Sequence, residues 1–273
     1  MKKEKTKVEK FFDKYAKDYA SDDLPPGIIN ARAAMSFAND ITWHFMLKYI
    51  PQNKEVKILD AGAGDGYWTQ KLIELGYKNV TLLDLSQKML NEARRRLSNL
   101  SHGIKIRVIK GDIVDMNMFD SNIFDYVFSQ FDAVSYCLNP KKATKELSRV
   151  VKKNRYIIVS LDTKFRRVPE FIEANQIVKA KKLLKTNISD EMGYPQYNLT
   201  WEELAEYYEE AGIEVIEVIG APVFMHQINE EILEKLEKDP EIRNKLLEME
   251  LEYCTNKSLV NFAGHLQMVG KKI

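Results

Sequence analysis

Cysteine is scarce in this sequence of 273 residues. Its two cysteines, Cys137 and Cys254, lie far apart, and neither has a cysteine or histidine nearby at the spacing of metal ligands. This pattern argues against a metal site built on thiolates. We therefore expect both cysteines to be reduced and structural, and we predict no metal site.

Long apolar runs are also absent. The Lys-rich N-terminus passes directly into mixed charged residues, and no segment approaches about 18 uninterrupted apolar residues. We therefore expect a cytoplasmic protein without membrane insertion. With 45% apolar and 30% charged residues, the composition is that of a folded globular protein. The length suits one large domain with insertions.

A surplus of one charge is missing as well, since 41 Lys and Arg residues nearly balance 40 Asp and Glu residues. Nucleic acid is therefore not favoured as a partner, because phosphate neutralisation needs a basic surplus. The charge is nevertheless uneven: residues 141–186 hold 14 basic and 4 acidic residues, and residues 228–253 hold 9 acidic and 4 basic ones. Solvated helix faces explain such runs. A site for an anionic substrate near the basic stretch is the alternative.

The hydrophobic pattern predicts a parallel sheet, because short β-rich runs alternate with helical stretches and with turns that contain Gly or Asp. The expected strands are Lys57–Ala61, Val80–Leu83, Lys105–Ile109, Phe124–Phe128, Tyr156–Leu161, Ile213–Ile219 and Leu259–Val269. Thr200 with Glu203 three residues later predicts the start of a further helix. Residues 1 to about 50, about 163–199 and about 221–258 lie outside the alternation, and we expect them to cover one face.

The most informative stretch is the glycine-rich sequence from Ile58 to Gly66, which reads ILDAGAGDG. A buried strand that turns sharply into a helix needs residues without side-chain bulk, so that the backbone can approach a ligand at the helix N-terminus. Gly62, Gly64 and Gly66 meet this need. A dinucleotide-binding fingerprint would place its third glycine at position 67, where this chain has Tyr67, and no P-loop motif occurs anywhere in the chain.

Acidic residues stand at the ends of three expected strands. Asp84 follows the glycines by about 20 residues and could accept two hydrogen bonds from a ribose diol. Asp60, at the end of the first strand, suits a cationic amine better than a pyrophosphate. Asp112 could accept a hydrogen bond from an exocyclic adenine amino group while Ile113 packs on the ring. A sugar-containing ligand is therefore indicated.

Together these motifs resemble the class I S-adenosylmethionine-dependent methyltransferases, and within them the small-molecule group that includes the ubiquinone and menaquinone C-methyltransferases. The resemblance covers most of the chain from about residue 11 onward. It is carried by Phe12-Asp13-Lys14-Tyr15-Ala16 with Tyr19, by Leu59 to Gly66, by Asp84-Leu85-Ser86 with Met89-Leu90, by Gly111-Asp112, and by Phe124-Asp125-Tyr126-Val127.

The resemblance implies an α/β fold with a Rossmann-like, seven-stranded, mostly parallel sheet and helices on both faces. Its last strand would be antiparallel and inserted beside the fifth, and insertions would form a helical cap. Residues 1–50 would be an N-terminal helical lid. Residues 51–273 would be the S-adenosylmethionine-binding domain, with cap insertions at about 163–199 and 221–258.

The resemblance also implies S-adenosylmethionine as cofactor and S-adenosylhomocysteine as product. Asp60 would face the amino group of the cofactor, and Tyr15 and Tyr19 would close over it from the lid. A plain packing face with nearby aromatic residues is the alternative for both tyrosines. The implied cofactor contacts are Tyr15, Tyr19, Asp60, Ala61, Gly62, Gly64, Gly66, Asp84, Leu85, Met89, Asp112, Ile113, Ser129 and Gln130.

The expected activity is methyl transfer to an O, C or N atom of a small, partly apolar molecule. Enzymes that methylate amino groups of DNA or protein glutamine carry Asn-Pro-Pro-aromatic after the fourth strand, whereas this chain has Ser129-Gln130-Phe131-Asp132. The departure disfavours an exocyclic or amide nitrogen as acceptor.

A catalytic base is optional, because the sulfonium already activates the methyl group and in-line positioning does most of the work. For a hydroxyl or an acidic carbon a base would help. His226, after the sixth strand at the rim where ligands bind in open α/β sheets, is our first candidate, and Asp132 is the second. We expect His265, at the start of the last strand, to be structural.

The segments outside the sheet pattern should build the acceptor pocket. Their aromatic and Met residues suggest a partly apolar acceptor, and Arg32 and Arg166 could hold an anionic group. The expected acceptor contacts are Arg32, Phe131, Tyr197 and Phe224, and simple packing of the cap is the alternative. Two other functions remain open: an RNA methyltransferase that uses the basic residues 141–186, and a non-catalytic nucleoside-binding regulator with a blocked pocket. The sequence leaves open whether the chain is a monomer or a homodimer.

Overall fold

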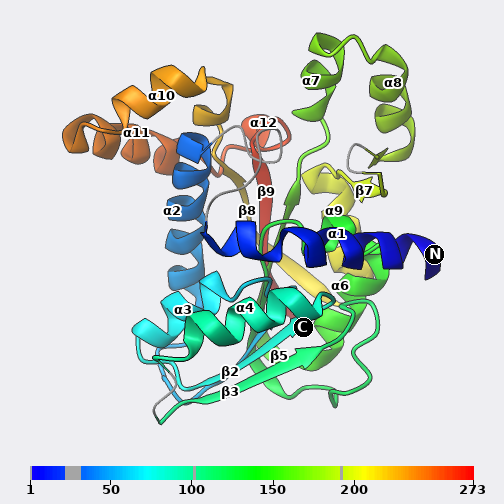
Figure 1. Cartoon of the computed structure of the whole chain (residues 1–273), viewed down its shortest axis with the longest axis vertical. Helices are drawn as coiled ribbons and strands as arrows, with labels where there is room; N and C mark the ends of the chain where they lie inside the picture. The colour runs from blue at the N-terminus through cyan, green and yellow to red at the C-terminus, as the bar shows by residue number, and fades with distance from the viewer. Residues whose placement is uncertain (1, 22–31, 101–102, 191–192) are drawn as a thin grey trace.

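The centre of the molecule is a seven-stranded sheet (Figure 1). The computed structural model describes residues 2–21, 32–100, 103–190 and 193–273, with side chains in the first range described for residues 7–19. The strands of the sheet are β1 (Lys57–Ala61), β2 (Asn79–Asp84), β3 (Lys105–Lys110), β4 (Phe124–Ser129), β5 (Val151–Asp162), β8 (Ile213–Ala221) and β9 (His265–Lys272).

The strand order is β3-β2-β1-β4-β5-β9-β8, and β9 is antiparallel to both of its neighbours. The remaining pairs are parallel. This confirms the mostly parallel sheet and the antiparallel last strand beside the fifth. The expected start of that strand at Leu259 is wrong, because Asn256 caps a short helix, α12 (Lys257–Val260), by accepting a hydrogen bond from the backbone N–H of Ser258. The strand begins at His265.

Helices cover both faces of the sheet, as expected. Successive strand residues alternate between the faces, so Ile58 packs on one side and Leu59 on the other. One face carries α2 (Arg32–Tyr49), α3 (Tyr67–Glu74) and α4 (Gln87–Leu97), and the other carries α5 (Ala133–Tyr136), α6 (Pro140–Val150) and α9 (Trp201–Glu210). The predicted capping box is confirmed at α9, where Thr200 and Glu203 exchange side-chain and backbone hydrogen bonds.

The N-terminal helix α1 (Lys2–Ser21) crosses the molecule beside α4 (Figure 1). Asp13 of α1 accepts hydrogen bonds from the Ser86 hydroxyl at 2.5 Å and from the Lys88 backbone N–H at 3.2 Å. The first turn of α4 therefore receives a carboxylate from a distant helix, which suits the positive end of its dipole. Val8 and Ala16 of α1 are buried against the rest of the protein. These contacts position α1 over the turn that follows β2.

The remaining elements stand at one end of the molecule rather than over one face of the sheet. They are α7 (Arg167–Glu173), α8 (Ile177–Thr186), the short strands β6 (Ile188–Ser189) and β7 (Gln196–Tyr197), the 3₁₀ turn η1 (Met225–Gln227), α10 (Glu230–Leu236) and α11 (Pro240–Tyr253). The pair α7–α8 lies opposite the pair α10–α11, which packs on α2 (Figure 1). Among the helices that the structure describes, none has the length and apolar character needed to cross a membrane.

A buried carboxylate joins α11 to the loop that follows β8. The Glu250 side chain is fully buried and accepts hydrogen bonds from the backbone N–H groups of Val223, Phe224 and Met225 at 2.7, 2.8 and 2.7 Å. Burial raises the pKa of this carboxyl, and the three N–H donors oppose that shift. The loop that leads to His226 is therefore positioned by one side chain.

Replacing Glu250 by alanine should leave these three backbone N–H groups without their acceptor. We expect Glu250→Ala to lower the free energy of unfolding by about 3 kcal/mol, measured by urea denaturation. Glu252→Ala is the matched control, because that side chain is exposed on the same helix, and it should change stability by less than about 0.5 kcal/mol. Equal losses in the two variants would contradict the role of Glu250.

Candidate active site

A cavity of about 860 Å³ opens where β1, β2, β3, β4 and β5 end. Its walls are formed by the turns after these strands, by α1 and α2, and by the segment around α7. Ligand pockets in proteins span about 300–1,000 Å³, so this cavity has room for two small molecules together. Parallel strands bring their carboxyl ends to one edge of the sheet, which explains why residues far apart in the sequence meet here.

The glycine turn after β1 has the sharp backbone that the sequence predicts. Gly62, Gly64 and Gly66 have φ values of 83°, 53° and 78°, a region that favours glycine. A Cβ atom on Gly62 would lie 2.2 Å from Cβ of Ala133, and one on Gly66 would lie 3.1 Å from Cβ of Ala93. A Cβ on Gly64 would meet nothing within 4 Å. Gly62 and Gly66 are thus required by packing, whereas Gly64 faces open space.

The acids at the ends of β1 and β2 differ in position, because Asp84 lines the cavity and Asp60 does not. Asp84 lines the cavity and accepts hydrogen bonds from the backbone N–H groups of Gly64 at 2.9 Å and Ser86 at 2.8 Å. Burial raises the pKa of Asp84 to about 6 in spite of these donors. Asp60 lies below the cavity wall, where it accepts a 2.7 Å hydrogen bond from the Thr69 hydroxyl, and burial raises its pKa to about 7. The hydrogen bond from Thr69 thus joins the end of β1 to α3.

The structure brings most of the implied cofactor residues to the cavity. Those that line it are Tyr19, Gly62, Gly64, Asp84, Leu85, Met89, Asp112, Ile113 and Gln130, and those outside its lining are Tyr15, Asp60, Ala61, Gly66 and Ser129. Tyr15 packs on Phe11 with ring centroids 4.8 Å apart, which fits the packing alternative for this residue. Ala61 belongs to the hydrophobic core. Cofactor contact stays a prediction for all of these residues.

Only one of the expected acceptor residues lines the cavity. The Phe131 ring lies between Trp68, stacked at 5.6 Å, and His265, edge-on at 5.1 Å. The other three, Arg32, Tyr197 and Phe224, lie outside the lining. Local sequence does not reveal which side of a cap helix faces inward.

Arg166 reaches the cavity but is already ion-paired there. Its guanidinium lies 2.8 Å from Asp162 and 2.9 Å from Glu170. The side chain of Arg167 is ion-paired in the same way, 2.7 Å from Glu170. Both arginines at this end of the cavity therefore pair with local acids, which weakens the case for an anionic acceptor held by Arg166.

His226, the first candidate base, does line the cavity. Burial lowers the pKa of its imidazole to about 4, and the nearby Arg166 guanidinium adds to that shift. At neutral pH the ring is therefore uncharged, and a group with so low a pKa is a weak proton acceptor. The role of His226 stays a prediction, with electrostatics that do not favour it.

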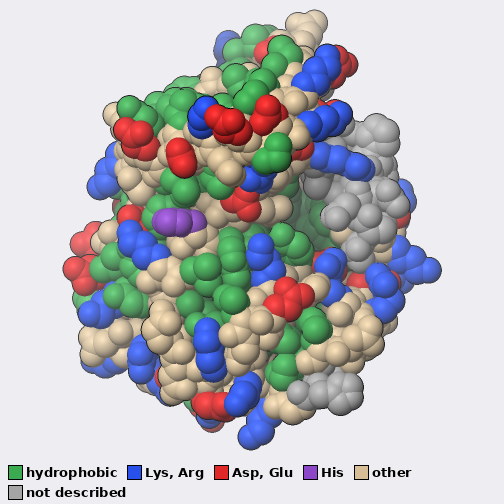
Figure 2. Space-filling model, turned by 90° about the vertical axis from the view of Figure 1, so that its left-hand side faces the viewer, with side chains coloured by type: hydrophobic (Ala, Val, Ile, Leu, Met, Phe, Trp, Pro, Cys, Tyr) green, Lys and Arg blue, Asp and Glu red, His purple; other side chains and the backbone are tan. Residues whose placement is uncertain are grey.

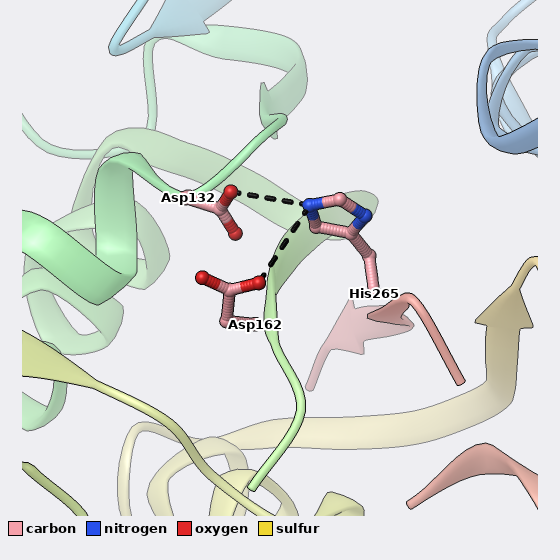
Figure 3. A group of neighbouring side chains, drawn as sticks. All are labelled: Asp132, Asp162 and His265. Atoms are coloured by element: carbon pink, nitrogen blue, oxygen red, sulfur yellow. Dashed lines mark hydrogen bonds and ion pairs between the residues drawn. The ribbon is translucent and has the colours of Figure 1, made fainter. Parts of the chain in front are cut away.

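His265, which we expect to be structural, lies at the cavity among acidic side chains. Figure 3 shows its ring beside two carboxylates: Nε2 lies 3.2 Å from Asp132 Oδ2 and 3.9 Å from Asp162 Oδ1. All three side chains line the cavity. Their ligand atoms lie within 4.8 Å of one another, so among the described residues this is the one group spaced to hold a metal ion. The place of His265 at the start of the last strand indicates this position, because an antiparallel strand starts at the edge where its parallel neighbours end.

Comparisons with known proteins agree with this fold. The sequence profile of the Methyltransferase domain family matches residues 58–154. The chain is 34% identical over 107 residues to a malonyl-[acyl-carrier protein] O-methyltransferase of Pectobacterium atrosepticum, which covers 39% of each protein. It is 32% identical over 98 residues to a chloroplastic 2-methyl-6-phytyl-1,4-hydroquinone methyltransferase of Oryza sativa, which covers 36% of this chain and 28% of the relative. The chain thus spans about two fifths or less of these relatives.

Solved structures extend the likeness of the fold to the whole chain. The magnesium protoporphyrin IX methyltransferase of Synechocystis with bound S-adenosylhomocysteine has a TM-score of 0.62 at 14% identity, covering 98% of this chain and all of that one. A methyltransferase in complex with the Haloferax volcanii Trm112 activator has a TM-score of 0.61 at 19% identity, covering 97% and 96%. Residues 58–154 are thus similar to the Methyltransferase domain family, and the chain shares the fold of these solved methyltransferases.

Proposed function

We propose that the chain transfers the methyl group of S-adenosylmethionine to a small, partly apolar acceptor. The observation that carries the proposal is the order of side chains across the cavity. The sheet order β3-β2-β1-β4-β5 puts Asp112 and Asp84 at one end, the glycine turn in the middle, and Phe131 and Asp162 at the other end. This order supports adenosine at the first end, methionine over the glycines and the acceptor beyond β4.

The cofactor end combines hydrogen-bond acceptors with apolar surface. The Asp84 carboxylate would accept hydrogen bonds from the ribose hydroxyls, and Asp112 would accept one from the adenine amino group. Leu85, Met89 and Ile113 line the same part of the cavity and offer apolar contacts to the base. The acidic lining also favours a ligand that carries an ammonium and a sulfonium charge.

The acceptor end supports a partly apolar molecule. Trp68, Phe131 and Tyr19 present aromatic surface, and Met35 of α2 lies in the same lining. Aromatic and apolar walls with a few polar groups are typical of small-molecule sites. The relatives named above are a malonyl-[acyl-carrier protein] O-methyltransferase and a 2-methyl-6-phytyl-1,4-hydroquinone methyltransferase, which is consistent with an oxygen-bearing acceptor.

The two alternative functions have less support. Most basic residues of 141–186 are ion-paired with acids, which leaves little of that charge for RNA phosphates; the pairs include Lys141 with Glu210, Arg149 with Glu146, Lys152 with Asp125, Lys164 with Glu203 and Lys182 with Asp190. On the face shown in Figure 2, Lys and Arg side chains are scattered among acidic ones. A regulator with a blocked pocket would not keep an open cavity of about 860 Å³.

Thermal unfolding with candidate ligands tests the proposed cofactor. S-adenosylmethionine or S-adenosylhomocysteine at about 100 times its Kd should stabilise the protein by about 2.7 kcal/mol and raise Tm by about 5–10 °C, whereas NAD should not. Asp84→Asn should weaken binding of both sulfur nucleosides about 10- to 100-fold, because a charged acceptor of two hydrogen bonds is lost. Asp120→Asn removes an exposed carboxylate and should leave binding unchanged. A Tm that responds to none of the nucleosides would contradict the proposal.

Two glycine variants separate packing from cofactor access. Gly62→Ala should lower the free energy of unfolding by about 2–3 kcal/mol, because its Cβ would collide with Ala133. Gly64→Ala should cost only about 1 kcal/mol, since its Cβ enters open space, but it should weaken S-adenosylhomocysteine binding by crowding the backbone approach. Urea denaturation and isothermal titration calorimetry measure the two effects. Unimpaired binding in the Gly64 variant would place the methionine part elsewhere.

A further inference from the structure

Three titratable side chains from distant parts of the chain meet at the acceptor end of the cavity. Asp132 comes from the turn after β4, Asp162 from the last residue of β5, and His265 from the first residue of β9 (Figure 3). Asp162 and His265 are directly paired across the sheet, so the backbone register itself places the imidazole beside the carboxylates. Neither Asp162 nor His265 has a part in the cofactor end proposed above.

The turn that carries Asp132 has an unusual backbone. Phe131 and Asp132 have φ values of 50° and 73°, and consecutive left-handed residues other than glycine persist only when surrounding contacts hold them. The Phe131 N–H donates a 2.7 Å hydrogen bond to the Ser160 hydroxyl, and the Phe131 ring is held between Trp68 and His265. This conformation directs the Asp132 carboxylate toward the imidazole.

The same turn lies against the glycine turn of the proposed cofactor site. Ala133 follows Asp132 and occupies the space that a side chain on Gly62 would need. A methionine group that lies over Gly62 would therefore be next to the turn of Asp132. The reactive methyl group and the Asp132 carboxylate would then lie in neighbouring parts of the cavity, because Ala133 brings the turn of Asp132 against Gly62.

A positive side chain already pairs with one carboxylate of the cluster. Asp162 is ion-paired with Arg166 at 2.8 Å and also accepts a hydrogen bond from Gln196. Burial alone would lower the pKa of His265, but Asp132 and Asp162 outweigh it and raise that pKa, so the two carboxylates favour the charged form of the imidazole. A divalent metal ion would have to compete with Arg166 for Asp162.

One oxygen of Asp132 is left for a ligand. Oδ2 faces the imidazole, whereas Oδ1 is buried without a hydrogen-bond partner among the described residues. Burial raises the pKa of Asp132 above its ordinary range. A buried acceptor without a donor is costly, and a ligand hydroxyl would supply the donor.

We propose that Asp132 Oδ1 is the catalytic base of the methyl transfer, that His265 is its positioning residue, and that the acceptor is a phenol-like hydroxyl compound. The inference rests on the proposed function and names its acceptor class. The acceptor oxygen forms a bond to the methyl carbon while the carbon–sulfur bond breaks and its electron pair stays on sulfur. The hydroxyl proton moves to Asp132 Oδ1 and reaches solvent after the products leave. Trp68, Phe131 and Tyr136 provide aromatic surface for a flat apolar body.

A coloured phenol tests the base without methyl transfer. The probe is 4-nitrophenol, bound to the protein saturated with S-adenosylhomocysteine, at a pH one unit below the point where the free phenol is half ionised. In the unmodified protein the bound probe should show the visible absorption of the phenolate, because its proton moves to Asp132. Asp132→Asn should lower the ionised fraction of bound probe at least tenfold, and Asp132→Glu should restore part of it.

His265→Gln tests the positioning role. It should reduce the ionised fraction of the bound probe less than Asp132→Asn does, while the probe still binds. The matched control is Asp125→Asn, because Asp125 lies near the start of β4, pairs with Lys152 at 2.8 Å, and is absent from the cavity lining. Its substitution should leave the bound probe ionised. Methyl transfer to hydroquinone should fall about 10²- to 10⁴-fold in kcat in Asp132→Asn, with KM for S-adenosylmethionine unchanged.

Several results would overturn the inference. One is that 4-nitrophenol fails to bind at millimolar concentration. Another is that it binds only as the neutral phenol. The third is that the ionised fraction of the bound probe is the same in Asp132→Asn as in the unmodified protein. Binding of Mn²⁺ that is lost in Asp132→Asn and that displaces the probe would assign the cluster to a metal instead. Failure of the proposed function is recognised separately, as the absence of a Tm shift with S-adenosylhomocysteine. In that case the ionisation of the probe is still read in the cofactor-free protein.

Discussion

The pairing of β9 with β5 is the constraint on which the site depends. Parallel strands bring only their carboxyl ends to the ligand edge of a sheet, so each contributes the turn that follows it. The single antiparallel strand reverses this rule and contributes its first residue. The register pairs Asp162 with His265 and also Ala221 with His265, so the imidazole stands between the ends of β5 and β8. His265 thus reaches the cavity from the strand itself.

A second constraint is the close contact between the turns after β1 and β4. Gly62 has no side chain because Ala133 fills that space, and Ala133 in turn follows the left-handed residues Phe131 and Asp132. The backbone that would approach the cofactor and the backbone that aims the carboxylate are therefore packed as one unit. A change in one turn displaces the other, which is why a single methyl group at Gly62 would disturb both ends of the proposed reaction.

Sequence predicted what is local and missed what depends on register and orientation. The strands and the glycine turn follow from hydrophobic period and from residues that tolerate positive φ, and both were confirmed. The antiparallel pairing of β9 is implied by the resemblance, but the register that sets His265 opposite Asp162 is not visible in the sequence. Three expected acceptor residues lie outside the cavity lining: Arg32, Tyr197 and Phe224. The sequence does not show them to be outside, because composition does not say which face of a cap segment points inward. Leu259 was assigned to a strand because two apolar residues cannot distinguish a strand from a capped turn of helix.

The charge balance of the cluster bears on how methyl transfer would proceed. A sulfonium is stabilised by nearby carboxylates, but stabilisation of the bound substrate alone raises the barrier to a step in which that charge disappears. Arg166 offsets the charge of Asp162, and the charged form of His265 would offset that of Asp132, so the field on a bound sulfonium would be smaller than that of two free carboxylates. His265 would therefore have two effects. It would orient the carboxylate that takes the proton, and it would reduce the stabilisation of the bound sulfonium by that carboxylate.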